Sequence, residues 1–267
     1  MDWVIVIPSY NRVETLKEKT LAVLKHYKIP KSKIYVFVAN EEQKALYEAG
    51  VGDDVGHIEV GIKGLPEVRN YIFDFFPTGK KIVSFDDDVR GFIEYDSTLK
   101  RKEKKLVSLT KMLDRGFEEC EKANGKFWGV YPSANGFFMK DTVTTDLKFI
   151  IGSFWGCINP GKDVRITIGN GEKEDYQRTI QFWERDGVVV RMNQYAVQTS
   201  TYATPGGLQE GNRLKREQKT VKIMLKKWPQ YIKMNPRRKS GYPEILLIKQ
   251  KAEGVKNTTR KIKKGTL

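Results

Sequence analysis

The chain has 267 residues, of which 39% are hydrophobic and 11% aromatic. This is enough apolar material for a sizeable core and too much for a disordered chain. The longest apolar runs, such as residues 4–7 and 149–151, are far shorter than the roughly 20 residues that cross a bilayer, and no apolar leader follows Met1. Two cysteines exclude a disulfide-rich scaffold and a zinc ribbon. We therefore expect a cytoplasmic protein that is not secreted and has no transmembrane segment.

The net charge of +15 is distributed unevenly along the chain. Residues 1–98 hold 13 basic and 16 acidic side chains, whereas residues 208–267 hold 18 basic and 4 acidic ones, a net charge of +14 for this last segment. A near-neutral body with a basic end predicts a catalytic domain joined to an element that binds polyanions; a tail that is merely solvated is the alternative. We expect a catalytic domain at 1–207, with halves at 1–98 and 99–207, and a basic C-terminal extension at 208–267.

Short apolar strands alternate with helices in the first 85 residues. The pattern predicts helices and strands in strict alternation, with strands at 3–7, 34–38, 57–62 and 81–85 and helices at 14–27, 41–49 and 66–76. Strands that are almost continuously apolar indicate a sheet buried on both faces. The fold class is therefore predicted to be α/β, with a mostly parallel, Rossmann-like sheet flanked by helices.

The rest of the chain is predicted to mix strands and helices. We expect the following elements: helices at 106–124, 174–186 and 208–228, and strands at 127–131, 137–140, 149–158 and 188–192. The turns between the first of these strands favour antiparallel pairing. Residues 100–105 are expected to form a charged surface segment, and residues 254–267 to be mobile because they contain little apolar material.

Three aspartates, Asp86, Asp87 and Asp88, directly follow the strand predicted at 81–85. Ligands of open α/β sheets bind outside the carboxyl ends of strands. Adjacent carboxylates repel one another unless a cation neutralises them, and Mg²⁺ and Mn²⁺ prefer oxygen ligands, which they share with diphosphates. Because alternate residues of an extended chain point to the same side, Asp86 and Asp88 are predicted to face one ion. The alternative is an acidic turn that only closes the strand.

A polar loop follows the first predicted strand and consists of Pro8, Ser9, Tyr10, Asn11 and Arg12. It offers hydroxyls, an amide, a guanidinium and an aromatic ring near a helix N-terminus, which suits contact with a nucleobase and a phosphate. Ordinary helix capping by Ser9 or Asn11 is the alternative.

These two loops, together with residues 65–70, resemble a GT-A glycosyltransferase of the family-2 type. This is the nucleotide-sugar-dependent class with a Rossmann-like sheet and a DXD metal motif. Order and spacing match over roughly residues 3–95. The resemblance implies a UDP-sugar or similar donor held by the loop at residues 8–12.

The resemblance also implies roles for single residues. Arg69 and Asn70 would lie beside the donor, and Asp86 and Asp87 would contact its nucleotide. Asp86 and Asp88 would bind Mn²⁺ or Mg²⁺ at the diphosphate. Many GT-A enzymes add a third metal ligand, often a histidine, from their C-terminal part. This chain has only His26 and His57, so that either another oxygen completes the coordination sphere or metal binding is weaker than usual.

A second acidic pair, Glu174 and Asp175, opens the helix predicted at 174–186 and follows a glycine-rich stretch at 169–171. Inverting GT-A enzymes carry their general base at such a pair, and the resemblance implies that Asp175 is the base. Glu174 would be its neighbour or a hydrogen-bond acceptor for the substrate. The reaction needs one carboxylate to take the proton of the attacking hydroxyl. Two alternatives remain. Both acids could be present only because a helix N-terminus favours negative charge, or one of them could form a covalent intermediate with the sugar.

Two further segments bear on the acceptor. Residues 152–156, aromatic and bracketed by glycines, either line an acceptor pocket or pack in the core. Basic residues then recur along the helix predicted at 208–228 and at 236–239 and 260–264, and such rows supply phosphate contacts that do not depend on sequence. The interspersed aromatics can stack on bases or anchor the tail: Trp228, Tyr231 and Tyr242.

A basic GT-A enzyme without membrane elements resembles, more loosely, the viral and phage glycosyltransferases that modify hydroxymethylated pyrimidines in DNA. These include the group associated with TET/JBP-like dioxygenases. This resemblance implies that residues 208–267 bind DNA and, for a viral protein, a place in the host cytoplasm or nucleus. A target base in a duplex would have to be flipped out to reach the donor.

We therefore predict a metal-dependent, inverting glycosyltransferase whose acceptor is a hydroxymethylpyrimidine in DNA. One alternative is a glycosyltransferase that acts on a glycan or lipid at an anionic membrane surface. A non-catalytic module that binds nucleic acid is the other. A nucleotidyltransferase is less favoured, because no glycine-rich phosphate loop follows the first strand.

Overall fold

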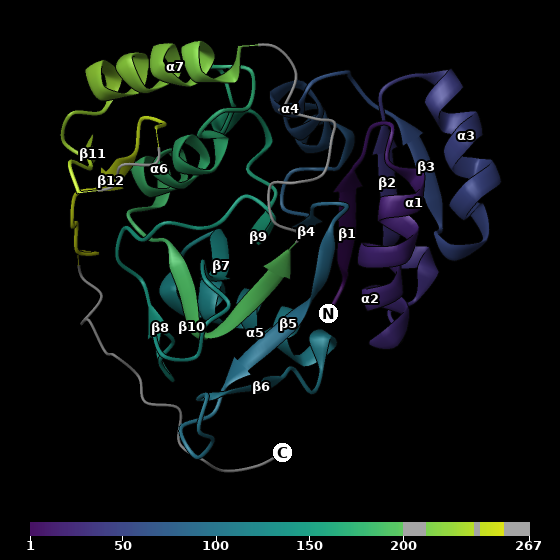
Figure 1. Cartoon of the computed structure of the whole chain (residues 1–267), viewed down its shortest axis with the longest axis horizontal. Helices are drawn as coiled ribbons and strands as arrows, with labels where there is room; N and C mark the ends of the chain where they lie inside the picture. Colours follow the sequence, from purple (N-terminus) through teal and green to yellow (C-terminus); the bar gives the residue numbers. More distant parts are fainter. Residues whose placement is uncertain (200–211, 238–240, 254–267) are drawn as a thin grey trace.

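The computed structural model describes residues 1–199, 212–237 and 241–253, and in these residues a large mixed sheet is flanked by helices (Figure 1). The sheet follows the order β3-β2-β1-β4-β9-β7-β10-β5-β6, and β8 pairs with β10. Its strands are β1 (Trp3–Pro8), β2 (Ile34–Val38), β3 (His57–Val60), β4 (Lys81–Phe85), β5 (Val89–Tyr95), β6 (Glu103–Lys105), β7 (Phe127–Tyr131), β8 (Val143–Thr144), β9 (Phe154–Ile158) and β10 (Val190–Thr199). A separate hairpin consists of β11 (Ile232–Met234) and β12 (Ile245–Leu247).

The predicted alternation of strands and helices in the first 85 residues is confirmed. β1 pairs in parallel with β2 and β4, and β2 in parallel with β3. The helices between them are α1 (Val13–Leu16), α2 (Ala22–His26), α3 (Glu41–Val51) and α4 (Leu65–Phe75). The helix expected at 14–27 contains a π-helical segment, η1 (Lys17–Leu21), that separates α1 from α2. The periodicity of apolar residues does not predict this π-helical segment. Short π-helical segments of this kind are frequent at functional sites.

The second half of the sheet is mixed. β9 runs antiparallel to both β4 and β7, and β10 runs parallel to β7 but antiparallel to β5. The predicted antiparallel pairing is therefore confirmed for β7 and β9. β10 is longer than the strand expected at 188–192, because its register shifts between Met192 and Ala196 and its second half leaves β7 to pair with β5.

Two predictions for this half are wrong, and the strand β5 is not among the predicted elements. Residues 137–140 form no strand, since they belong to a turn with Phe137 and Phe138 exposed. Residues 149–153 are also not a strand, because the chain passes across the start of α6 (Glu174–Asp186) before β9 begins. From the acidic triplet we expect the sheet-forming segment to end at residue 85. In the structure the triplet is instead a turn, and a second strand, β5, follows it directly.

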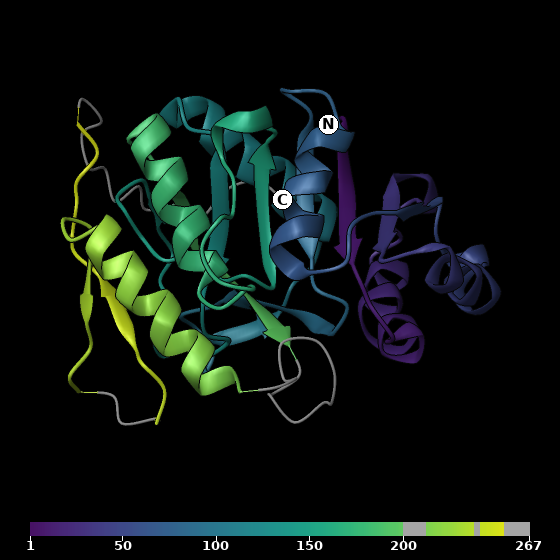
Figure 2. The same ribbon diagram turned by 90° about the horizontal axis from the view of Figure 1, so that it is seen from above.

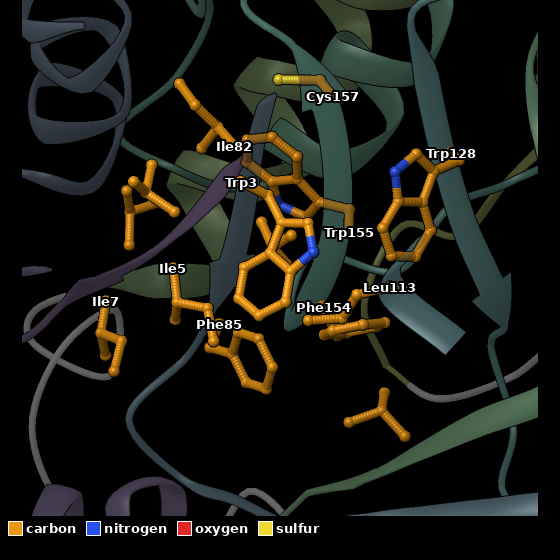
Figure 3. Close-up of a cluster of buried hydrophobic side chains, with 14 of the residues drawn as sticks. Trp3, Ile5, Ile7, Ile82, Phe85, Leu113, Trp128, Phe154, Trp155 and Cys157 are labelled. Carbon is orange, nitrogen blue, oxygen red and sulfur yellow. The ribbon is translucent and has the colours of Figure 1, made fainter. Parts of the chain in front are cut away.

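Large aromatic side chains fill the core on both faces of the sheet (Figure 3). α5 (Leu109–Ala123) covers one face, where a Cβ atom at Gly116 would lie 2.5 Å from the Trp128 ring. α4 and α6 cover the other face, where the Trp155 ring packs. Phe154 and Trp155 are both fully buried. The core-packing alternative therefore holds for these two residues, and they do not line an acceptor pocket.

The described part of the C-terminal segment packs against α6. α7 (Arg213–Lys227), β11 and β12 share a second hydrophobic cluster with α6: Ile168, Ile180, Val221, Met224, Trp228, Ile232 and Ile245. The exposed fraction of Trp228 is 1%, and its Nε1 donates a hydrogen bond to Glu184. The ring is therefore an anchor in the core and does not offer a face to a base.

Some predictions fall on residues outside the described part of the chain. These are the first residues of the helix expected at 208–228, the basic residues 238 and 239, and the whole of 254–267. Within the residues that are described, none of the helices is long and apolar enough to cross a bilayer.

Candidate donor and catalytic site

The acidic triplet forms a tight connection between β4 and β5, and the π-helical segment holds it in place. The Thr20 hydroxyl donates a hydrogen bond to the carbonyl of Asp86 at 2.7 Å and accepts one from the amide of Val89 at 3.0 Å. The amide of Asp86 donates to the carbonyl of Ser153 at 2.9 Å. One hydroxyl and one backbone bond thus fix the direction in which the three carboxylates leave the sheet.

Asp87 points back into the protein. It is buried, accepts a hydrogen bond from the Ser9 hydroxyl at 2.7 Å and forms an ion pair with Arg12 at 2.8 Å. Burial raises the pKa of Asp87 to about 7, although Arg12 and Ser9 oppose this rise. The carboxylate joins the triplet to the polar loop after β1, and these contacts hold the loop in place.

The polar loop is itself held by α3. The Tyr47 hydroxyl lies 2.7 Å from the Ser9 hydroxyl and accepts a hydrogen bond from the Arg12 amide at 3.1 Å. Asn11, whose φ is 53°, forms two hydrogen bonds with Gln43. The backbone amide of Asn11 donates to Oε1 of Gln43 at 2.9 Å, and the side-chain oxygen of Asn11 accepts from Nε2 of Gln43 at 2.7 Å. The capping alternative is not what is seen, because these partners belong to α3 and not to the helix that follows the loop.

Pro8, Tyr10 and Asn11 lie toward the solvent, and Asn11 is exposed. Pro8 ends β1 and is half-buried. The Tyr10 ring is also half-buried, and Nζ of Lys63 lies 5.1 Å from its centre. Tyr10 is the aromatic side chain that the loop presents at this side.

Asp86 and Asp88 carry the triplet's partly exposed carboxylates. The Asp86 side chain is 39% exposed and accepts a hydrogen bond from Arg69 Nη2 at 2.9 Å. Asp88 is half-buried and lies 3.8 Å from Arg12 Nη2. Burial raises the pKa of Asp86 to about 6; the charges of Asp88 and Glu174 raise it further, whereas Arg69 lowers it. The two carboxylates thus leave excess negative charge at the carboxyl end of β4.

This donor set fits a hard divalent cation that is shared with a ligand. Among the described residues, no three His, Cys, Asp or Glu side chains come close enough together to hold an ion by themselves. Two aspartates would leave further coordination positions for diphosphate oxygens and water, as Mg²⁺ sites commonly do. His57 is stacked on Tyr35 at 3.9 Å, on the β2–β3 side of the sheet, and His26 lies beside Tyr27.

Arg69 and Asn70, adjacent on α4, have different partners. Arg69 is buried and donates hydrogen bonds to the Ser84 hydroxyl, to Asp86 and to the carbonyl of Gly152. Asn70 uses both ends of its amide on the backbone of Ile166, donating to the carbonyl and accepting from the amide, each at 2.9 Å. Asn70 therefore fastens the segment before α6 to α4, and Arg69 alone lies at the acidic triplet.

Glu174 is buried between two arginines. Its Oε1 lies 3.7 Å from Arg69 Nε, and its Oε2 accepts a hydrogen bond from Arg178. The Arg178 guanidinium is also buried and lies 4.3 Å from the centre of the Trp155 ring. Both oxygens of Glu174 thus face arginines inside the protein.

Asp175 occupies the first turn of α6, next to Glu174 but on the more open side. It is half-buried and accepts a hydrogen bond from the Tyr176 amide at 2.9 Å. Gly152 faces it, since a Cβ atom there would lie 3.5 Å from the Cβ of Asp175 and 2.8 Å from Oε1 of Glu174. Burial raises the pKa of Asp175 to about 6; Glu174 raises it further and Arg178 opposes this. Such a carboxylate is ionised at neutral pH and is more basic than a free aspartate, as a general base requires.

The structure therefore brings the acidic triplet and the acidic pair together, although about 90 residues separate them in the sequence. The link is a row of alternating charges, in which Arg69 lies between Asp86 and Glu174, and Glu174 between Arg69 and Arg178. Buried charges of this kind require partners, which explains why both arginines lie under the site.

The residues that hold this site from behind were not among those predicted from the sequence. Arg178 follows Glu174 by four residues, a spacing that indicates a helical ion pair. No comparable signal predicts the contacts of the loop before α6 with α7. There, Arg216 Nε lies 2.7 Å from Glu172 and Lys173 Nζ lies 2.7 Å from Glu217.

Comparison with known proteins gives the fold. No protein-family model matches the chain, and no curated protein matches it either. Solved structures do match, among them TarS of S. aureus. Its residues 1–349 in complex with UDP give a TM-score of 0.51 at 12% identity, over 86% of this chain and 72% of that one.

Two further TarS structures agree with this match. A second structure of residues 1–349 gives a TM-score of 0.50 at 13% identity, over 74% of this chain and 59% of that one. A longer TarS chain gives a TM-score of 0.50 at 13% identity, over 85% of this chain and 44% of that one. The chain thus spans less than two thirds of these two proteins. They are glycosyltransferases of the GT-A type, and the predicted fold class is confirmed: the chain has the GT-A fold.

Proposed function

We propose that the protein is a glycosyltransferase that moves a sugar from a nucleotide-sugar donor to a hydroxyl group and depends on a divalent metal. The observation that carries the proposal is the row of charges from Asp86 through Arg69 to Glu174, which puts a candidate diphosphate site beside a candidate base, Asp175. The GT-A fold supports it, and TarS in complex with UDP supports a UDP-sugar as the donor.

In this proposal the donor is bound at the end of β1 and β4, and the acceptor is activated at the start of α6. The loop at residues 8–12 receives the nucleotide, with the Tyr10 ring as the contact for the base. Asp86 and Asp88 would hold Mn²⁺ or Mg²⁺, which supplies charge stabilisation to the departing diphosphate. Asp175 takes the proton of the acceptor hydroxyl as its oxygen attacks the anomeric carbon. Attack in one step from the side opposite the leaving group inverts the anomeric centre.

Glu174 and Arg69 serve this chemistry indirectly. The two residues set the position of the first turn of α6, and burial, together with the negative charge of Glu174, keeps the pKa of Asp175 above that of a free aspartate. A proton acceptor beside a fixed anion is more basic than it would be alone. This assigns to Glu174 the role of a positioning residue for the base.

For the acceptor, we propose a hydroxymethylated pyrimidine in DNA. A stripe of exposed lysines on α7 supports a polyanionic partner: Lys215, Lys219, Lys222 and Lys226. They recur at intervals of three and four residues and therefore lie on one face of the helix. The hydroxymethyl oxygen would be the nucleophile, and the base would be unpaired when it reacts.

The same proposal divides the chain into a catalytic domain at 1–207 and a basic extension at 208–267. The shared cluster of α6 and α7 supports an extension that is docked on the catalytic domain. A DNA contact on α7 would then have a fixed position relative to Asp175.

The experiment is sugar transfer onto oligonucleotides that contain 5-hydroxymethylcytosine or 5-hydroxymethyluracil, with a panel of nucleotide sugars, read by mass spectrometry. We expect a metal-dependent gain of one sugar on modified DNA only, and its loss in Asp175→Asn. The matched control is Asp163→Asn, an exposed acid outside the site, which should retain transfer.

Two other results would overturn parts of the proposal. Metal-dependent hydrolysis of a donor without transfer to DNA would remove the DNA acceptor and direct the search to glycans and to lipids at anionic membranes. Neither transfer nor hydrolysis with any donor, in a protein that is folded, would overturn the glycosyltransferase itself.

A further inference from the structure

A surface tip remains that the proposed site does not use. It consists of the turn after β5, residues 96–102, and the loop after β7, residues 132–140. The backbones of the two segments are in close contact, since a Cβ atom at Gly136 would lie 2.4 Å from the Arg101 carbonyl oxygen; the Gly136 amide also donates to the side chain of Glu103, the first residue of β6, at 2.7 Å. Since only glycine allows this approach, the two segments form one surface.

The tip is a built structure. In its first segment, the Asp96 amide donates to the Lys102 carbonyl at 3.0 Å. In its second segment, the Phe138 amide donates to the Asn135 carbonyl at 3.1 Å. A small hydrophobic cluster lies beneath, formed by Ile93, Met139 and Ala196. The exposed side chains of the tip are therefore presented by a supported backbone.

Apolar and basic side chains lie exposed together on this surface. The exposed fractions of Phe137 and Phe138 are 65% and 61%, and that of Leu99 is 44%. Four exposed cations belong to the same two segments: Lys100, Arg101, Lys102 and Lys140. Nζ of Lys102 lies 5.8 Å from the centre of the Phe137 ring. Adjacent exposed rings indicate a contact surface, and the surrounding charge favours a polyanion.

The tip lies on the same side of the sheet as the proposed site. β4 and β7 both run antiparallel to β9, so their carboxyl ends meet at one edge. The acidic triplet follows β4, and the second segment of the tip follows β7. Seven-residue β5 leads from Asp88 to the tip, a span of roughly 20 Å. In Figure 2, β5 and β6 lie beyond the carboxyl end of β1, on the side where α7 begins.

We propose that the tip binds the strand of DNA beside the acceptor base, with Phe137 and Phe138 stacked on unpaired bases and the four cations on phosphates. The inference rests on the proposed function in taking DNA as the acceptor. Aromatic rings within a basic groove are the usual platform for single-stranded nucleic acid, because every base offers a face to stack on. A flipped acceptor base leaves unpaired neighbours of this kind.

An anionic membrane is the other polyanion that the charge would suit. Interfacial membrane anchors are typically amphipathic helices with a broad apolar face. Both segments of the tip are free of helix, and their exposed apolar part is two rings and one leucine among four cations. The observations therefore favour nucleic acid.

The test is fluorescence anisotropy of the full chain with single-stranded oligonucleotides that contain 5-hydroxymethylcytosine, across a series of salt concentrations. The double variant Phe137→Ala with Phe138→Ala should lose about tenfold or more in affinity, with its salt dependence unchanged. The double variant Lys100→Gln with Lys140→Gln should reduce the slope of log K against log salt by about 0.7 for each phosphate that is no longer neutralised.

Matched controls come from the other end of the sheet. Leu46→Ala removes an equally exposed apolar side chain on α3, and Lys25→Gln with Lys31→Gln removes two exposed cations; DNA affinity should stay unchanged in both. UDP binding by calorimetry, and the melting temperature, should be the same in all variants, which separates a weakened DNA interface from a damaged fold.

The outcomes separate this inference from the function on which it rests. Tip variants that bind DNA like the wild type overturn the inference, whether or not sugar transfer is found. Weakened binding to phosphatidylserine–phosphatidylcholine vesicles with unchanged DNA binding overturns it in favour of a membrane. Reduced DNA binding of the tip variants, in a protein that hydrolyses a donor but transfers no sugar to DNA, supports the tip as a DNA-binding surface and overturns DNA as the acceptor.

Discussion

Arg69 Nε lies 3.7 Å from Oε1 of Glu174, and this contact connects α4, in the half that is proposed to bind the donor, to the first turn of α6. Both side chains are buried. The same guanidinium reaches Asp86, so one cation neutralises two carboxylates that belong to different halves of the chain. Arg69 is thus a direct link between the triplet and the helix turn that carries the candidate base.

Replacement of Arg69 tests this dependence. Arg69→Met should reduce the free energy of unfolding by about 2–3 kcal/mol, because Asp86 loses a charge-assisted hydrogen bond and the buried Glu174 keeps only one of its two arginines, Arg178. Urea denaturation at pH 7 measures the change. Lys81→Met, which breaks the more exposed pair with Glu121, is the control and should cost less than about 1 kcal/mol. A loss of similar size in both variants would contradict the role given to Arg69.

The raised pKa of Asp175 predicts how turnover depends on pH. A general base must be ionised, so kcat/KM should rise with pH through about 6 and level off near pH 7. The measurement is a profile of kcat/KM from pH 5 to 8. In Glu174→Gln, the midpoint should move to lower pH, because the neighbouring negative charge is removed. A profile that stays flat across this range would exclude Asp175 as the base.

The ionised side chain of Asp175 should also lower the free energy of unfolding at neutral pH. Its pKa is raised in the folded state, so the ionised form is disfavoured there; the cost is absent below the pKa of the unfolded chain and complete above about pH 6. Asp175→Asn should therefore raise the melting temperature more at pH 8 than at pH 4. Equal shifts at both pH values would mean that burial of the charge is not the cause.

The ion pairs between α7 and the loop before α6 should act on turnover. Lys173, with a φ of 57°, directly precedes the acidic pair and lies 2.7 Å from Glu217, which is buried. Lys173→Gln and Glu217→Gln should each lower kcat about tenfold and leave UDP affinity unchanged, because they displace the base and not the donor site. A double-mutant cycle should give a coupling energy of about 1–3 kcal/mol. Additive effects would show that the pair does not position the loop.

The metal can be tested through Asp88. Its carboxylate is half-buried and lies 3.8 Å from Arg12, whereas those of Asp86 and Asp87 lie 2.9 and 2.8 Å from an arginine, so its oxygens are less engaged. Asp88→Asn should raise the Mn²⁺ concentration for half-maximal transfer at least tenfold, while UDP binding without metal stays the same. Calorimetry of UDP with and without Mn²⁺ provides the second measurement. An unchanged metal requirement would remove Asp88 from the proposed site.

The sequence determined the local elements and the residue types of the site. The strands Ile34–Val38 and Lys81–Phe85 and the helix Glu174–Asp186 follow from apolar patterning, because each buries a face that is defined within a few residues. The acidic triplet and the acidic pair are identifiable by their place after a strand and at a helix start. Patterning of this kind is local, so it survives whatever the chain packs against.

Only the tertiary structure decided what these acids do. Asp86 and Asp87 are adjacent in sequence, yet one is partly exposed and the other is held by Arg12 and Ser9. Glu174 and Asp175 differ in the same way, because two buried arginines engage Glu174 alone. The partners come from distant parts of the chain, and packing sets both the burial and the neighbouring charge that fix each carboxylate's role. The docking of α7 on α6 through Trp228 likewise depends on contacts that basic composition does not reveal.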